Sequence, residues 1–173
     1  MKIAVGSDHG GFAYKSEIIK HLESLGHQVL DVGTYSSDSC NYAEFGLEAA
    51  ALVGKGEADY GILICNTGEG IAMAANKIKG VRCGIGYADE VAGLIRRHNN
   101  ANVISFGAHF MTLEEVLRRI DIFLTTDFEG GRHEKRVQTI IDAEKEQILS
   151  TFEQKIEFLV NFSEKNTCYS LYI

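Results

Sequence analysis

Five short apolar runs rich in β-branched residues punctuate the chain: KIAVG (2–6), HQVLDVG (27–33), DYGILIC (59–65), VRCGIGY (81–87) and NVISFG (102–107). Several lack the alternation of apolar and polar residues typical of half-exposed strands, so we expect strands buried on both faces. Between the runs, apolar residues recur at helical spacing. Alternating strands and helices predict an α/β protein, with a three-layer α/β/α Rossmann-like fold and a five-stranded parallel sheet.

Two further helices are predicted after the last strand. The first is LEEVLRRIDIFL (113–124), and the second is a long helical pattern over residues 137–162. Apolar residues form one broad stripe along the second helix: Ile140, Ile141, Ile148, Phe152, Ile156 and Leu159. Such a stripe has to be buried, against the body of the protein or against another subunit. We therefore expect one doubly wound domain followed by a helical C-terminal extension.

Composition narrows the class of protein. With 173 residues, 45% of them apolar, the chain can form one domain with a sizeable core. Its net charge of −7 argues against a general binder of nucleic acid or acidic membranes, but is compatible with a small phosphorylated ligand. No apolar stretch resembles a signal peptide or reaches membrane-spanning length. The four cysteines show neither CxxC pairing nor metal-ligand spacing, so we expect free thiols in a reducing cytoplasm.

In an open parallel sheet, ligands bind beyond the carboxyl ends of the strands. Chemically capable residues follow several of the predicted strands: Ser7-Asp8-His9-Gly10-Gly11, Cys65-Asn66-Thr67-Gly68-Glu69-Gly70, Ala88-Asp89 and Ala108-His109. The helix after the fourth strand ends in Arg96-Arg97-His98-Asn99-Asn100. This edge of the sheet is therefore the predicted site.

The loop after Cys65 is the most informative of these segments. Its glycines allow the backbone to approach a ligand, and the next helix directs its amino terminus to the same place. Such a loop suits an anion, either a phosphate or a developing enolate oxygen. A neighbouring cysteine would have its thiolate stabilised. An arbitrary cysteine at a strand end is more often a small buried hydrophobe, but the adjoining loop favours a functional Cys65.

Two other functions are weighed against this one. Gly68 and Gly70 match the first glycines of a dinucleotide-binding GxGxxG, and Asp89 lies about twenty residues on, but Met73 stands where a small residue is needed. A signalling receiver module would need an aspartate at the position of Cys65. The sequence therefore favours neither a nucleotide-binding module nor a receiver.

For three other groups of residues, the pattern alone leaves structural and functional roles open. Asp8 could cap the helix starting near Phe12, or form a functional pair with His9. His98 could simply be a cation at a helix end. Arg132 and Arg136 could lie on a solvated helix face, or could grip a phosphate together with His133.

Taken together, four motifs resemble the ribose-5-phosphate isomerase B family, which also contains the galactose-6-phosphate isomerase subunits. They are GSDHGG (6–11), ILICNTGEGIAMAANK (62–77), RRHNNANV (96–103) and EGGRHEKRV (129–137). The resemblance covers residues 1–148, which we expect to form a sugar-phosphate isomerase domain. It leaves residues 149–173 as the extension, packed on the body or on a partner subunit.

The resemblance implies an aldose–ketose isomerase that acts in carbohydrate metabolism, in the pentose phosphate pathway. It also implies that the enzyme uses neither a metal nor an organic cofactor. Cys65 would be the base, Thr67 and the loop amides would hold the enediolate oxygen, and His98 would help to open the furanose ring. Substrate contacts would come from Asp8, His9, Asn66, Thr67, Gly68, Glu69, Gly70, Asn99, His109, Arg132 and Arg136. A homodimer or dimer of dimers is implied, in which His98 and Asn99 reach the partner's cysteine loop.

Two residues depart from the family pattern close to the predicted chemistry. Asn66 stands where the family often has glycine, and His109 replaces a common arginine. The resemblance implies ribose 5-phosphate as substrate, and these departures leave a six-carbon sugar phosphate (galactose 6-phosphate or allose 6-phosphate) as the alternative.

Overall fold

The computed structural model describes residues 1–167, with side chains described through residue 146 and for residues 150–152, 154 and 156. The chain divides into two units, Met1–Glu134 and Lys135–Ile173. This division precedes the boundary that we expect at residue 148, which remains a prediction. Cys40, Cys65 and Cys83 are free thiols, as expected, whereas Cys168 lies outside the described residues.

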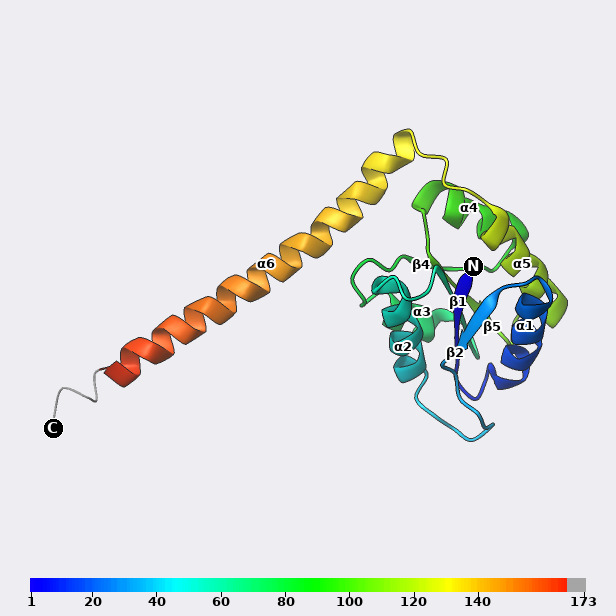
Figure 1. Ribbon diagram of the computed structural model, residues 1–173, viewed down its shortest axis with the longest axis horizontal. Coiled ribbons are helices and arrows are strands. Elements are labelled where there is room, and N and C mark those ends of the chain that lie inside the picture. The colour runs from blue at the N-terminus through cyan, green and yellow to red at the C-terminus, as the bar shows by residue number, and fades with distance from the viewer. Residues whose placement is uncertain (168–173) are drawn as a thin grey trace. The chain divides into compact units, whose positions relative to one another are not determined.

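The first unit contains a five-stranded parallel sheet, which confirms the predicted fold. Its strands are β1 (Lys2–Ser7), β2 (Gln28–Asp31), β3 (Tyr60–Cys65), β4 (Cys83–Ile85) and β5 (Val103–Gly107), in the order β2-β1-β3-β5-β4 (Figure 1). β4 is shorter than the predicted run 81–87, and side chains bond the amides at its start. The N–H of Arg82 donates to Asn102 Oδ1 at 2.8 Å, and that of Cys83 donates to Asn76 Oδ1 at 2.9 Å.

Helices cover both faces of this sheet. On one face lie α1 (Phe12–Ser24), α4 (Asp89–Asn99) and α5 (Leu113–Thr125), and on the other lie α2 (Tyr42–Gly54) and α3 (Glu69–Ala75) (Figure 1). Successive strand residues point to opposite faces, so Ile3 and Val5 join the first core while Ala4 joins the second. Both faces of the strands are thereby buried, which explains why their sequences lack alternation.

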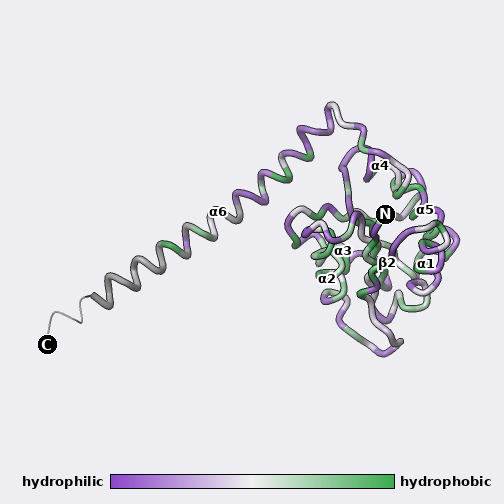
Figure 2. Tube along the Cα trace, viewed as in Figure 1, coloured by the Kyte–Doolittle hydropathy of each residue, from purple (hydrophilic) through white to green (hydrophobic). Residues whose placement is uncertain are grey.

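The long helix α6 spans Arg132–Thr167, longer at both ends than the predicted 137–162. Hydrophobic and hydrophilic residues alternate along its coloured part (Figure 2). Of the predicted apolar stripe, Ile140, Phe152 and Ile156 are 47%, 66% and 53% exposed, whereas the side chains of Ile148 and Leu159 lie outside the described residues. Burial of the stripe therefore remains a prediction. Within residues 1–167, no helix combines the length and apolar character needed to cross a membrane.

Candidate active site

The strand order reverses beside β1, because β2 pairs on one side and β3 on the other. In such sheets a ligand crevice forms beyond the carboxyl ends of the strands at the reversal. Here β1 ends at Ser7 and β3 ends at Cys65, and the N–H of Asp8 donates to Ile64 O at 3.4 Å. The fold thus brings the Asp8-His9 segment and the cysteine loop to the predicted edge.

Cys65 lies at the base of its loop and is only 4% exposed. Its Sγ accepts a hydrogen bond from the N–H of Gly68 at 3.1 Å. Gly68 has a φ of +85°, and a Cβ there would approach the Phe106 carbonyl carbon to 2.8 Å, so only glycine fits. This amide hydrogen bond holds the Cys65 sulfur at the mouth of the loop.

The remaining loop residues surround this cysteine. The N–H of Ala108 donates to Cys65 O at 2.9 Å, and the N–H of His109 donates to Asn66 O at 3.1 Å. Thr67 Oγ1 accepts from the N–H of Glu69 at 3.3 Å. Asn66, Thr67, Glu69 and His109 are exposed, while Gly70 packs against the Tyr42 ring. The loops after β3 and β5 therefore form one surface beside the thiol.

Asp8 shapes the turn before α1. Its Oδ1 accepts from the N–H groups of Gly10 and Gly11 at 2.9 and 3.2 Å. The N-cap of α1 is Gly11, which makes no side-chain cap hydrogen bond. The alternative in which Asp8 caps the helix is therefore wrong, because the chain turns for three residues before the helix begins.

His9 is held by a residue that the sequence did not indicate. Its Nδ1 accepts from the N–H of Cys40 at 3.2 Å and lies 3.7 Å from the Cys40 thiol. Cys40 belongs to the loop before α2, far from His9 along the chain. No motif or periodicity connects two such loops, so only the folded structure could identify this contact.

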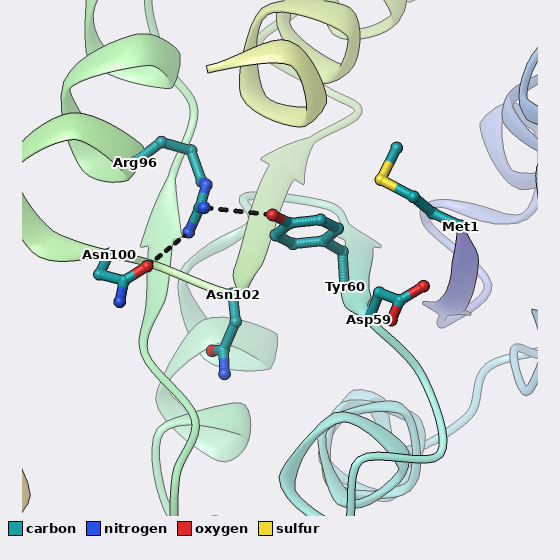
Figure 3. Close-up of a pocket in the computed structure, with 6 residues that line it drawn as sticks. All are labelled: Met1, Asp59, Tyr60, Arg96, Asn100 and Asn102. Atoms are coloured by element: carbon teal, nitrogen blue, oxygen red, sulfur yellow. Dashed lines mark hydrogen bonds between the residues drawn. The ribbon is translucent and has the colours of Figure 1, made fainter. Parts of the chain in front are cut away.

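The carboxyl end of α4 carries His98 and Asn99, and buried Arg96 fixes it in place. Arg96 donates to Ala101 O at 2.6 Å, to Asn100 Oδ1 at 3.0 Å and to Tyr60 Oη at 3.1 Å. Arg96 lines a pocket of about 460 Å³ together with Met1, Asp59, Tyr60, Asn100 and Asn102. Figure 3 shows these six side chains. This pocket lies where β1 and β3 begin, so it is distinct from the edge that carries Cys65.

His98 belongs to a cluster with Glu129 and His133. The two imidazole rings are stacked, with centroids 4.1 Å apart and planes 5° apart, and Glu129 Oε2 lies 3.8 Å from His98 Nε2. Arg132 Nε donates to His133 Nε2 at 3.3 Å. The structure thus brings His98 and Arg132 into one group, and adds Glu129, which sequence reasoning missed because a loop carries it there.

The types of residue in this cluster are those that bind divalent metals, and one ligand atom from each lies within 4.8 Å of the others. The nearly parallel rings point their in-plane lone pairs side by side, not toward one point. The guanidinium of Arg132 adds positive charge next to His133. This arrangement favours proton transfer and anion binding over metal coordination.

Asn99 and Arg136 complete the predicted set. Asn99 is exposed, and its carbonyl accepts from Arg82 Nε at 3.2 Å. Arg136 is part of α6 but belongs to the second unit, so its role in phosphate binding remains a prediction.

The acid required for dinucleotide binding is engaged elsewhere. Asp89 accepts from Arg118 Nε at 2.7 Å and from Arg119 Nε at 3.0 Å, and these hydrogen bonds lower the pKa of the Asp89 carboxyl. Met73, at the third glycine position of the fingerprint, is 66% exposed. Neither residue is arranged to hold a ribose or a pyrophosphate.

Comparison with known proteins decides the family. Residues 3–140 match the family model described as Ribose/Galactose Isomerase. The chain is 44% identical over 144 residues to ribose-5-phosphate isomerase B of Escherichia coli K12, covering 83% of this chain and 97% of that protein. The chain belongs to the ribose/galactose isomerase family.

Solved structures of the ribose/galactose isomerase family agree. The chain is similar to ribose-5-phosphate isomerase B of Clostridium thermocellum, with a TM-score of 0.83 and 43% identity, covering 85% of this chain and 99% of that one. It is also similar to the Mycoplasma genitalium protein with bound ribulose-5-phosphate, with a TM-score of 0.82 and 41% identity, covering 84% and 97%. These findings confirm the resemblance drawn from the four sequence motifs.

Proposed function

We propose that the protein is an aldose–ketose isomerase that interconverts ribose 5-phosphate and ribulose 5-phosphate. The observation that carries this proposal is the Cys65 thiol at a strand end, accepting a hydrogen bond from the N–H of Gly68. Support also comes from the family, which includes relatives named ribose-5-phosphate isomerase B and a structure with bound ribulose-5-phosphate.

The proposed chemistry is a proton transfer between neighbouring carbons. A proton next to a carbonyl is weakly acidic, so its removal needs a placed base and stabilisation of the oxyanion. Cys65 removes the proton from C2 and returns it to C1, while Thr67 and the loop amides hold the enediolate oxygen. The electrons stay within the sugar, so these residues can carry the reaction without a cofactor.

The other predicted residues have binding roles in this proposal. Arg132 and Arg136 hold the phosphate, Asp8, His9 and Asn99 contact the sugar, and His98 helps to open the furanose ring. Two copies of the chain form a dimer with a shared site, alone or as a dimer of dimers. We infer that the enzyme works in the cytoplasm, in pentose phosphate metabolism.

A six-carbon sugar phosphate is the second candidate substrate. The two departures from the family pattern, Asn66 and His109, are joined by a backbone hydrogen bond of 3.1 Å directly after Cys65 and β5. Both side chains are exposed on that surface. We infer that a change in sugar preference would arise from these two side chains.

The test is an isomerase assay with ribose 5-phosphate, allose 6-phosphate and galactose 6-phosphate, each with EDTA present. Cys65→Ala should still bind substrate but lose at least about two orders of magnitude in kcat, the usual contribution of a general base. Cys83→Ala is the matched control and should retain turnover. Saturable nucleotide binding without any isomerase activity would overturn the proposal.

A further inference from the structure

Glu129 is held beside His98 by its backbone as well as by its charge. Its N–H donates to Arg97 O at 3.0 Å, one residue before His98. Gly130 and Gly131 follow with φ values of +69° and +55°, a conformation that favours glycine. The two glycines separate Glu129 from His133, and both of these residues approach the His98 ring.

The contacts distinguish the roles of the two histidines. Because Arg132 Nε donates to His133 Nε2, that nitrogen acts as an acceptor. His98 Nε2 instead faces a carboxylate oxygen at 3.8 Å. A carboxylate oxygen at this distance interacts favourably with the imidazolium that forms when the ring takes up a proton, and Nδ1 is the nitrogen that faces away from Glu129 on the opposite side of the ring. His98 is therefore the ring prepared for proton transfer.

We propose that Glu129 is a positioning residue, which orients His98 and stabilises its imidazolium while His98 opens the furanose ring of the substrate. This proposal rests on the proposed isomerase function. In the step, His98 Nδ1 takes the proton from the C1 hydroxyl, and a carbonyl forms at C1 as the bond from C1 to the ring oxygen breaks. The electron pair of that bond goes to the ring oxygen, which takes the proton back from His98.

The chemistry of the product separates ring opening from enediolate formation. Ribulose 5-phosphate carries its phosphate on the hydroxyl that would close a furanose, so it is already open. Cys65 can therefore exchange its C1 proton with deuterium from the solvent without any ring opening. Turnover of ribose 5-phosphate, in contrast, needs both steps.

The experiment compares these two rates in Glu129→Gln, which removes the charge and keeps the shape. Turnover of ribose 5-phosphate should fall at least about tenfold, a fraction of the usual contribution of acid–base catalysis. Deuterium exchange into ribulose 5-phosphate, followed by proton NMR, should stay within about twofold of wild type. Glu129→Asp should recover part of the turnover, and the matched control Glu134→Gln should leave both rates unchanged.

Two results would overturn the proposal. One is an equal loss of turnover and exchange in Glu129→Gln, which would mean that Glu129 supports the fold or the enediolate step. The other is an unchanged turnover. In a His98→Asn background the added Glu129→Gln should cost less than about twofold, because the residue acts through His98. If the wild type neither isomerises nor exchanges, the proposed function itself fails, and this outcome is distinct from the other two.

Discussion

At the scale of single residues, the cysteines show how surroundings decide reactivity. Burial raises the pKa of the Cys83 thiol to about 12. Cys65 is only 4% exposed, whereas Cys83 is half-buried, and the Cys65 sulfur accepts an amide hydrogen bond at the mouth of a glycine loop. Two cysteines of the same sheet therefore have different surroundings, and we expect their thiols to differ in reactivity.

We predict that alkylation distinguishes these two thiols. The thiolate is the reacting form, so Cys83 should stay protonated and unmodified at every pH well below about 12. Iodoacetamide at mildly alkaline pH should modify Cys65 and inactivate the enzyme, and ribose 5-phosphate should protect it. Mass spectrometry of peptides identifies the modified sites. Modification of Cys83 as fast in the folded protein as in urea would contradict the prediction.

Phosphate binding gives the second prediction at this scale. Arg132→Ala and Arg136→Ala should each weaken substrate binding by roughly 1.5–3 kcal/mol, the range for hydrogen bonds to charged groups. Inhibition by inorganic phosphate should weaken in parallel, because both ligands use the same cations. Arg118→Ala removes an exposed arginine that pairs with Asp89, and serves as a control. If the two variants differ from wild type only in melting temperature and bind substrate normally, both arginines lie on a solvated face and do not bind the phosphate.

At the scale of elements, α5 begins with a reciprocal cap. Thr112 Oγ1 accepts from the N–H of Glu115 at 3.3 Å, and Glu115 Oε2 accepts from the N–H of Thr112 at 2.8 Å. We predict that Thr112→Ala lowers the free energy of unfolding by about 1 kcal/mol, the usual cost of losing such a cap. Urea titration measures this loss, and Thr112→Ser should retain most of the stability. An equal loss in both variants would show that the methyl group, not the hydroxyl, matters.

The elements also show where sequence reasoning works. β3 is unbroken by polar residues because both of its faces are buried, so its sequence alone predicts a central strand and places Cys65 at its end. Loop contacts carry no such local signal. The hydrogen bond from Cys40 to His9 and the approach of Glu129 to His98 join segments distant in sequence, and neither could be predicted. Asp8 was ambiguous because capping and turn formation use the same residue types.

At the scale of the whole molecule, we predict that the C-terminal extension is not needed for the chemistry. The family match ends at residue 140, and α6 continues to Thr167. We predict that a variant ending at residue 148 keeps kcat and KM within about twofold of wild type. Sedimentation velocity and thermal unfolding then locate the partner of the apolar stripe. If the truncated variant forms a smaller assembly, the stripe packs against a partner subunit. If only its melting temperature falls, the stripe packs against the body of the same chain. A loss of activity would contradict the predicted domain boundary.

The shared active site is the other prediction for the whole molecule. Within one chain, the described contacts join the end of β3, with Cys65, to the loops after β1 and β5. They also join His98 to Glu129 and His133, and His133 to Arg132. We predict that a functional site combines the first group of one subunit with the second group of its partner. Each inactive variant, Cys65→Ala or His98→Ala, would then supply what the other lacks.

Mixing these variants tests the prediction. When they are unfolded together and refolded in equal amounts, about half of the dimers should be mixed, and twofold symmetry gives each dimer two sites. In a shared arrangement, one site of a mixed dimer carries both substitutions and the other carries neither, so about a quarter of all sites regain activity. If each site belongs to one chain, every site keeps one substitution. Mixed dimers that form, as differently tagged subunits would reveal, yet stay inactive would therefore rule out the shared site.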